Sequence, residues 1–431
     1  MKSGARIQAV IDILTAFEAR PKPLERMLKD WGRANRYAGS KDRRAIGEYA
    51  YSVMRMRGEL AHKMASTEPR ALMIALLHRQ SLQSGDDGWK TWFDGSTHAP
   101  EPLAMAEVQQ LVADETELPP AARHNIQDWL LEDVTRTFGA DATVAMAAMA
   151  GRATIDLRVN ALKTTRLEAH EALAGENIET GGTPLAPLGL RIVEADGGPR
   201  STVDQTDAYK RGLVEIQDEG SQLAAMIAGA KPGEQVIDLC AGAGGKTLAL
   251  AAAMGNHGQI FACDTEDAKL KNLKPRLARA GVRNVQVKKI RPFTPGPDDV
   301  DPDLYELASS ADLVVLDVPC SGSGTWRRHP DARWRLTPED LDTYCAAQVS
   351  ILKRGADLVK PGGRMVYITC SILARENEEQ VTRFLNSNSD FKQQDIDLSL
   401  PGIRIKRSLQ MAPHITGTDG FFVAVMQKQQ D

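Results

Sequence analysis

Two cysteines occupy places in this sequence where a reactive thiol would be useful. Cys320 lies shortly after the apolar run Leu313–Leu316, and Cys370 lies shortly after the apolar run Met365–Ile368. Both runs are predicted strands of a parallel sheet, and ligands of such sheets bind outside the carboxyl ends of the strands. We therefore expect the two thiols to face one crevice, where a thiolate could act as a nucleophile.

The other three cysteines have less distinctive surroundings. Cys240 lies in a glycine-rich turn, Cys263 in an apolar predicted strand and Cys345 in a predicted helix. The last two are typical of small buried hydrophobic residues. No two cysteines form a CxxC pair, and the histidines beside them show no ligand spacing. We therefore expect neither a disulfide framework nor a bound metal ion.

The glycine-rich turn has the features of a nucleotide-type site. Residues 236–247 read VIDLCAGAGGKT, which predicts a strand, a turn and the start of a helix. Glycines at 242, 244 and 245 permit positive φ and close approach of a ligand, and the helix start offers free N–H groups. Asp264 ends the next predicted strand, about twenty residues further on, where a carboxylate can accept hydrogen bonds from ribose hydroxyls.

Three ligand classes compete for this turn. A phosphate-binding P-loop would need a glycine where Cys240 stands, and a nicotinamide dinucleotide would need a third glycine where Lys246 and Thr247 stand. The D-x-x-x-G-x-G spacing from Asp238 to Gly244 fits S-adenosylmethionine better. A glycine turn without any ligand remains the alternative.

The chain of 431 residues is long enough for about three domains. Residues 1–150 show helical apolar stripes, among them Ile7, Val10, Ile11, Leu14 and Phe17. Residues 151–225 mix short strands, a helix and glycine turns, which indicates a small α/β subdomain. From residue 226 to 431, strands alternate with helices, which predicts a parallel sheet covered on both faces.

The net charge of −4 argues against a polybasic binder, but it conceals an asymmetry. Residues 1–60 contain 13 Lys and Arg against 7 Asp and Glu. This segment is either a solvated helix face or an RNA-binding surface. The sequence contains no run of about 18 uncharged apolar residues, so we expect a cytoplasmic protein with no membrane partner.

Five further motifs together carry a resemblance. They are DVPCSGSG at 317–324, TCS at 369–371 followed by ENE at 376–378, DGFFVA at 419–424, YKRGLVEIQDEGSQ at 209–222 and LRVNALK at 157–163. In combination they resemble the Sun/Fmu (RsmB-type) family of RNA 5-methylcytosine methyltransferases, over about residues 150–428. The N-terminal helices resemble, more weakly, a NusB-like RNA-binding domain.

The resemblance implies an α/β fold: a Rossmann-like S-adenosylmethionine methyltransferase domain, a small RRM-like α/β subdomain and an all-α NusB-like N-terminal domain. It implies that Cys370 adds to C6 of a cytosine, that Cys320 assists release of the product, and that Asp317 contacts the base edge. The cofactor is then expected to contact Cys240, Ala241, Gly242, Ala243, Gly244, Gly245, Lys246, Asp264 and Asp317.

One stretch departs from the family pattern. Residues 285–291, at the third strand, read VQVKKIR and contain no carboxylate for the adenine, so that subsite stays open. The interleaved basic and aromatic residues of 326–334 could be a solvated loop, but they favour RNA contact. Glu376 and Glu378 are interpreted as structural, capping or orienting residues.

We expect a monomer that acts on RNA, and small-subunit (16S) ribosomal RNA is the leading substrate. The same chemistry on transfer RNA is the nearest alternative. A non-catalytic RNA-binding ribosome assembly factor with this fold is the alternative from another class.

Overall fold

The computed structural model describes residues 1–431 except 114–116, 194–202, 293–301, 404 and 431. The chain forms two compact units. One contains Met1–Arg152 together with Thr325–Thr337, and the other contains Ala153–Gly324 together with Pro338–Asp431. The division into three domains at residues 150 and 225 stays a prediction.

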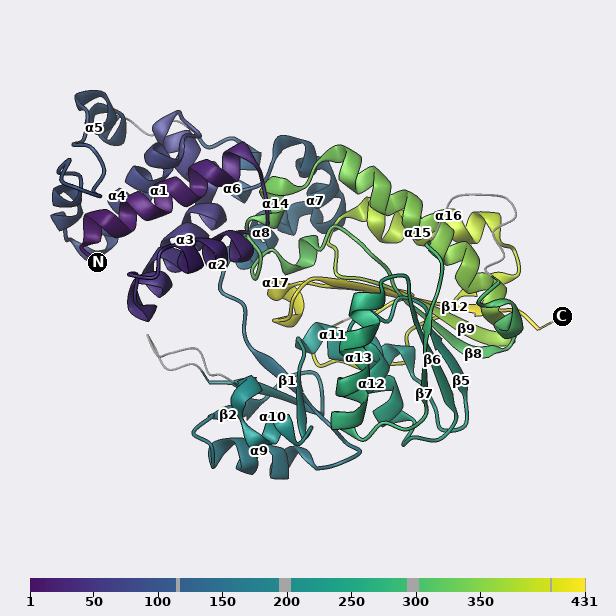
Figure 1. Cartoon of the computed structure of the whole chain (residues 1–431). Coiled ribbons are helices and arrows are strands. Elements are labelled where there is room, and N and C mark those ends of the chain that lie inside the picture. Colours follow the sequence, from purple (N-terminus) through teal and green to yellow (C-terminus); the bar gives the residue numbers. More distant parts are fainter. Residues whose placement is uncertain (114–116, 194–202, 293–301, 404, 431) are drawn as a thin grey trace. The chain divides into compact units, whose positions relative to one another are not determined.

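The first unit is helical (Figure 1). The predicted stripe on the first helix is buried and packs against residues of the third and fourth helices, which together form the core of this unit. An amphipathic stripe needs such partners, because its burial supplies most of the stability of a helix. The helices are α1 (Ser3–Ala19), α2 (Leu24–Ala34), α3 (Ser40–Met64), α4 (Pro69–Ser84), α5 (Met105–Val112), α6 (Pro120–His124), α7 (Leu131–Phe138), α8 (Ala142–Ala150) and the late α14 (Ala332–Arg335).

The segment Thr325–Thr337 belongs to the helical unit, although it follows the Cys320 motif in the chain. Trp326 and Arg333 are both fully buried. The guanidinium of Arg333 lies 5.2 Å from the ring centre of Trp326 and donates hydrogen bonds to the carbonyls of Asn125 and Met149, both at 3.2 Å. The prediction that the aromatic and basic residues of this loop contact RNA is therefore wrong for Trp326 and Arg333.

The rest of this segment is anchored in the same way. Trp334 donates through Nε1 to the carbonyl of Met54 at 2.8 Å, and the buried carboxylate of Asp331 accepts from the backbone N–H of Leu24 at 3.1 Å. These bonds satisfy polar groups that would otherwise be buried without partners. The two tryptophans are thus structural residues of the helical unit.

The second unit begins with a small antiparallel sheet in the order β2-β3-β1-β4. Two helices accompany it, and their side chains share its apolar core. The elements are β1 (Asp156–Val159), α9 (Arg166–Ala174), β2 (Thr180–Gly182), β3 (Gly189–Ile192), α10 (Asp207–Lys210) and β4 (Val214–Ile216).

A larger sheet forms the centre of this unit, in the order β10-β12-β9-β8-β5-β6-β7, with β11 paired to β12. The five strands β5–β9 are parallel, as the alternation of strands and helices predicts. The sheet is nevertheless mixed, because β10, β11 and β12 pair antiparallel at one side. The strands are β5 (Gln235–Asp238), β6 (Gln259–Asp264), β7 (Val285–Lys289), β8 (Ala311–Asp317), β9 (Val359–Thr369), β10 (Phe391–Gln393), β11 (Ser408–Met411) and β12 (Phe421–Lys428).

Helices cover both faces of the large sheet. Val236 packs in a core with residues of the helices that follow β4 and β5, whereas its neighbour Ile237 packs in another core with residues of the helices beside β9. This alternation places nearly every side chain of a central strand in an apolar core, which is why the strands read as continuous apolar runs. The helices are α11 (Glu219–Ala228), α12 (Gly245–Ala253), α13 (Asp267–Ala280), α15 (Pro338–Leu358), α16 (Glu378–Ser387) and the short α17 (Pro413–Thr416).

Within the part of the chain that the structure describes, none of the helices is long and apolar enough to span a membrane.

The burial of Trp326 leads to a test. Replacement Trp326→Ala should lower the free energy of unfolding by about 3–5 kcal/mol, because it leaves a large cavity in the helical core. Urea unfolding of the full chain measures this change. If stability is unchanged while affinity for RNA falls, Trp326 contacts RNA and the structural assignment is wrong.

Candidate active site

The two cysteines meet at the carboxyl ends of neighbouring strands. β8 pairs with β5 on one side and with β9 on the other, so the segments that follow these strands are adjacent. The Sγ atoms of Cys320 and Cys370 lie 3.4 Å apart, and both thiols are free and partly exposed. The sequence thus predicted a pair of thiols that the fold brings into contact.

The contact between the sulfurs affects the protonation of Cys320. The hydrogen bond with Cys370, together with burial, raises the pKa of the Cys320 thiol well above its ordinary value. Cys320 therefore keeps its proton at neutral pH.

A buried carboxylate joins the two cysteine loops. Glu376 accepts hydrogen bonds from the backbone N–H of Ser321 at 2.8 Å and from the hydroxyls of Ser321 and Ser371, both at 2.5 Å. The amide of Gln348 in α15 donates to it at 3.1 Å. Since each serine follows one of the two cysteines, Glu376 fixes the distance between the thiols.

The next residue ties the Cys370 loop to its own strand and to the last sheet strands. Asn377 accepts a hydrogen bond from the hydroxyl of Thr369 at 2.6 Å and donates to the carbonyl of Ser371 at 3.0 Å. Tyr367 donates to the backbone carbonyl of Glu376 at 2.6 Å. The interpretation of Glu376 as an orienting residue agrees with these contacts.

Two glycines, Gly324 and Gly420, allow the Cys320 loop to lie against the segment that precedes β12. Gly324 donates to the carbonyl of Cys370 at 2.9 Å and accepts from the N–H of Gly420 at 2.8 Å. A Cβ on Gly324 would lie 1.9 Å from the carbonyl oxygen of Gly420. The glycines of the DVPCSGSG and DGFFVA motifs are therefore needed for close backbone packing.

The glycine-rich turn follows β5 at the same edge of the sheet. Asp264, at the end of β6, accepts from the N–H of Gly242 at 2.8 Å, and the N–H of Ala241 bonds to the carbonyl of Cys263 at 2.8 Å. Gly244 has a φ of +88° and a Cβ there would lie 2.1 Å from Leu273. The turn is thus rigid before any ligand binds.

Two arginines from outside the turn hold its carbonyl groups. Arg158, in β1 of the small sheet, donates to the carbonyl of Gly245 at 2.7 Å and to the side chain of Gln217. Arg276, in α13, donates to the carbonyl of Ala243 at 2.6 Å. Burial lowers the pKa of Arg158 to about 10, so it stays charged at neutral pH.

Lys246 takes part in the site through its side chain, whereas its neighbours in the turn are expected to contact the cofactor through their backbone. Its buried ammonium lies 2.7 Å from the carboxylate of Asp317 and 5.3 Å from the ring centre of Phe421. Asp317 is the more exposed partner of this pair, with 34% of its side chain accessible. The pair connects the glycine-rich turn with the Asp317-Val-Pro-Cys320 segment.

Asp238 is a residue to which the sequence analysis gave no role. It is fully buried at the end of β5, and the hydroxyl of Thr247 donates to its Oδ2 atom at 2.6 Å. Its Oδ1 atom has no hydrogen-bond partner, and burial raises its pKa to about 7. A buried carboxylate oxygen without a partner signals a missing donor, and the D-x-x-x-G-x-G spacing was the available sequence signal.

The third strand shows no acidic residue near its end, in agreement with the sequence. β7 ends in Lys288 and Lys289, and the N–H of Ile290 bonds to the carbonyl of Asp264 at 3.1 Å.

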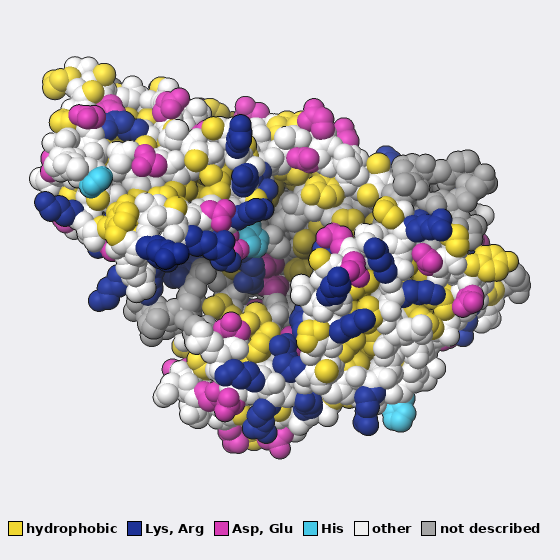
Figure 2. All heavy atoms as spheres, in the orientation of Figure 1, with side chains coloured by type: hydrophobic (Ala, Val, Ile, Leu, Met, Phe, Trp, Pro, Cys, Tyr) yellow, Lys and Arg dark blue, Asp and Glu magenta, His cyan; other side chains and the backbone are white. Residues whose placement is uncertain are grey.

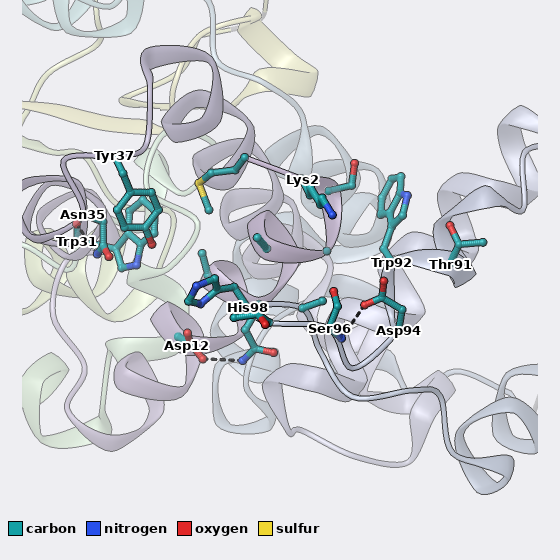
Figure 3. Close-up of a pocket in the computed structure, with 18 residues that line it drawn as sticks. Lys2, Asp12, Trp31, Asn35, Tyr37, Thr91, Trp92, Asp94, Ser96 and His98 are labelled. Atoms are coloured by element: carbon teal, nitrogen blue, oxygen red, sulfur yellow. Dashed lines mark hydrogen bonds between the residues drawn. The ribbon is translucent and has the colours of Figure 1, made fainter.

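The helical unit contains a separate hollow of about 700 Å³ (Figure 3). Trp31 and Tyr37 lie on one side of it and Trp92 on another, with Lys2 and His98 between them. Tyr37 is 72% exposed. This hollow belongs to the unit that contains the basic segment 1–60, and RNA binding by this unit stays a prediction.

Comparisons with known proteins identify the family. The family model described as 16S rRNA methyltransferase RsmB/F matches residues 225–427, and that of the RsmF/B-like ferredoxin-like domain matches residues 127–196. The probable ribosomal RNA small subunit methyltransferase B of Synechocystis sp. is 34% identical over 322 residues, which is 74% of this chain and 70% of that protein. This chain belongs to the RsmB/F family of 16S rRNA methyltransferases. The predicted family and enzyme class are confirmed.

Further relatives and solved structures agree. The probable ribosomal RNA small subunit methyltransferase B of Bacillus subtilis is 34% identical over 63% of this chain, but the match covers 59% of that protein. The crystal structure of PH0851 covers 99% of both chains with a TM-score of 0.73 and 26% identity. A methyltransferase homologue from Pyrococcus horikoshii covers 72% of this chain and 97% of its own, with a TM-score of 0.60 and 27% identity. The predicted combination of a methyltransferase domain, a small α/β subdomain and a helical N-terminal region is confirmed, and the family model describes the small subdomain as ferredoxin-like.

The close approach of Gly324 and Gly420 gives a prediction for the site. Replacement Gly324→Ala should destabilise the protein by about 1–3 kcal/mol through overpacking, and should lower methylation activity by displacing the Cys320 loop. Gly181→Ala is the matched control, because a Cβ at Gly181 meets no atom within 4 Å. Thermal unfolding and initial rates of both variants measure the effect, and equal behaviour of the two would contradict it.

Proposed function

We propose that this protein transfers a methyl group from S-adenosylmethionine to C5 of a cytosine in 16S ribosomal RNA, through a covalent bond between Cys370 and C6 of the base. The observation that carries the proposal is the 3.4 Å contact between the thiols of Cys320 and Cys370 at strand ends next to the glycine-rich turn. Membership of the RsmB/F family supports it.

The glycine-rich turn and its neighbours have the groups that S-adenosylmethionine requires. The backbone of residues 240–245 would lie against the cofactor, and Asp264 would accept from the ribose hydroxyls through the lone pairs that Gly242 leaves free. The unpartnered Oδ1 atom of Asp238 suits the ammonium of the methionine part. When bound, the cofactor supplies an electrophilic methyl group on a sulfonium.

Cys370 provides the nucleophile because C5 of cytosine alone is too weak. Its thiolate forms an Sγ–C6 bond, and the electron pair of the C5–C6 double bond becomes available at C5 for bonding to the methyl group. Asp317, held by Lys246, is assigned to the base edge, where it favours protonation or hydrogen bonding at N3 during the addition.

Release requires a base for the C5 proton, and Cys320 is assigned this role. Its pKa is raised mainly by the hydrogen bond with Cys370, and that interaction weakens once the Cys370 sulfur is bonded to carbon. Cys320, which is partly exposed, can then release its own proton to water and, as a thiolate, accept the proton from C5. The C5–C6 double bond re-forms and the Sγ–C6 bond breaks, which returns the Cys370 thiolate.

The substrate is tested by mapping 5-methylcytosine with bisulfite sequencing in a deletion strain. We expect one or more positions to disappear from 16S ribosomal RNA and to return with the wild-type gene but not with Cys370→Ala. Loss from transfer RNA instead would support the nearest alternative. An unchanged map, or full restoration by Cys370→Ala, would contradict the proposed chemistry and favour an assembly factor.

The roles of the two thiols are separated by trapping. Cys320→Ala should form the adduct but fail to resolve it, so a protein–RNA species should persist on a denaturing gel. Cys370→Ala should form none, because it lacks the nucleophile. Cys345→Ala, a thiol in α15, is the control and should methylate like the wild type. An adduct in the Cys370→Ala protein would reverse the assignment.

The role of Asp238 predicts a pH dependence of cofactor binding. Because the pKa of Asp238 is about 7, its carboxylate is lost as the pH falls, and the dissociation constant should rise by up to tenfold per unit below pH 7. Asp238→Asn should bind the cofactor about tenfold more weakly at pH 7.5, as expected for loss of a charged hydrogen bond. Isothermal titration calorimetry between pH 6 and 7.5 measures both effects.

The same residue gives a control without cofactor. Burial favours the protonated form of Asp238, so its stabilising contribution is present below about pH 4 and is lost progressively as the pH rises to the folded-state pKa of about 7. The unfolding free energy of Asp238→Asn should lack this loss. If the variant keeps the wild-type affinity and pH profile, Asp238 does not contact the cofactor.

A further inference from the structure

A basic hollow lies where two sequence motifs without an assigned role come together. One is the 157–163 motif of β1 and the turn after it, and the other is the 209–222 motif that begins at the end of α10. The hollow has a volume of about 520 Å³ and is lined by Lys163, Lys210, Arg211, Leu213, Ala278 and Arg279. Four of these six residues are cationic, which indicates an anionic ligand.

Lys163 is held in place without being neutralised. Its ammonium donates to the carbonyl of Arg211 at 2.8 Å and to the carbonyl of Arg279 at 2.6 Å. Among the described residues, no carboxylate forms an ion pair with it. An ammonium has three N–H donors, so one donor and the whole positive charge stay available to a ligand.

The backbone around this lysine is fixed. Gly212 has a φ of +72°, and a Cβ there would lie 2.1 Å from the carbonyl oxygen of Arg279. The amide of Asn160 donates to the carbonyl of Gly212 at 2.9 Å and to that of Ala280 at 2.8 Å. The small sheet and α13 are thereby joined at the floor of the hollow, and its cations have little freedom to separate.

The acidic residues nearby leave an excess of positive charge. The buried carboxylate of Glu215 pairs with both Arg276, at 3.0 Å, and Arg279, and Asp207 lies 3.9 Å from Lys210. Arg211 is exposed, and in the described part of the chain its guanidinium has no ion-pair or hydrogen-bond partner. Figure 2 shows Lys and Arg side chains on the face near α13 and the small sheet.

We propose that this hollow binds a phosphate group of the RNA backbone, with Lys163 and Arg211 as its principal ligands. This proposal rests on the proposed function, because it assumes that RNA is the substrate. A fixed ammonium beside a free guanidinium suits a phosphodiester, because lysine binds it as a point charge and arginine through parallel N–H donors. Such contacts orient a nucleic acid without reading its sequence.

The test compares Arg211→Gln and Lys163→Gln with the wild type, using 16S ribosomal RNA transcribed in vitro. We expect KM to rise about tenfold for each variant, and kcat to stay unchanged for Arg211→Gln, because a charged hydrogen bond outside the reacting centre is lost. The slope of log Kd against log salt concentration should fall by about 0.7–0.9 per lost contact. Arg211→Gln is the cleaner variant, because its side chain holds no other described group.

Arg383→Gln is the matched control, since Arg383 is an exposed arginine in α16, outside the hollow. Affinity for an unrelated RNA of equal length should weaken as much as affinity for the target, because the contact is to the backbone. An unchanged KM and salt slope, or a loss confined to the target RNA, overturns the phosphate site. The hollow could instead bind only free inorganic phosphate. In that case Arg211→Gln would weaken phosphate binding but leave the salt dependence of RNA binding unchanged, and this result would also overturn the proposal. If the wild type fails to methylate RNA at all, the proposed function fails instead.

Discussion

The carboxylate of Glu376 is the group on which the geometry of the two thiols depends. Burial of a charged carboxylate is unfavourable because the group loses its hydration, and burial therefore raises the pKa of Glu376. Four donors offset this cost, and three of them come from Ser321 and Ser371, the residues that follow the two cysteines. Removing the carboxylate would leave these buried donors unpaired on two separate loops and would weaken the support of the 3.4 Å contact between the sulfurs. The bond from Gly324 to the carbonyl of Cys370 and the bond between the hydroxyls of Ser323 and Ser371 join the same loops.

The same carboxylate also influences the proton on the thiols. Its negative charge adds to the effects of Cys370 and burial in raising the pKa of Cys320. A single group therefore holds the loops together and helps to keep Cys320 protonated. The distance between the two thiols and the protonation of Cys320 thus depend on the same buried carboxylate.

The sequence was sufficient to predict what depends on local pattern. The short strands β5–β9, the stripe of α1 and the convergence of Cys320 and Cys370 follow from strand and helix periodicity and from the rule that parallel strands end at one edge. It was insufficient where a residue packs against something distant in the chain. Trp326 and Arg333 look like an RNA-binding loop, but Arg333 is buried against the carbonyls of Asn125 and Met149 and packs over the ring of Trp326. Likewise, the lack of a hydrogen-bond partner at the Oδ1 atom of Asp238 can be recognised only from the positions of all the atoms around it.

Side chains of β1 and the turn after it bind backbone groups of the helices that cover the large sheet. Arg158, in β1, is buried and fixes the carbonyl of Gly245 at the start of α12, whereas Lys163, after the end of β1, binds the carbonyl of Arg279 in α13. Both helices border the glycine-rich turn: α12 begins at its end, and Arg276 in α13 donates to the carbonyl of Ala243. A displacement of this segment would consequently disturb the turn from two directions. This explains why the small sheet is built into the same compact unit as the methyltransferase sheet rather than attached by a flexible linker.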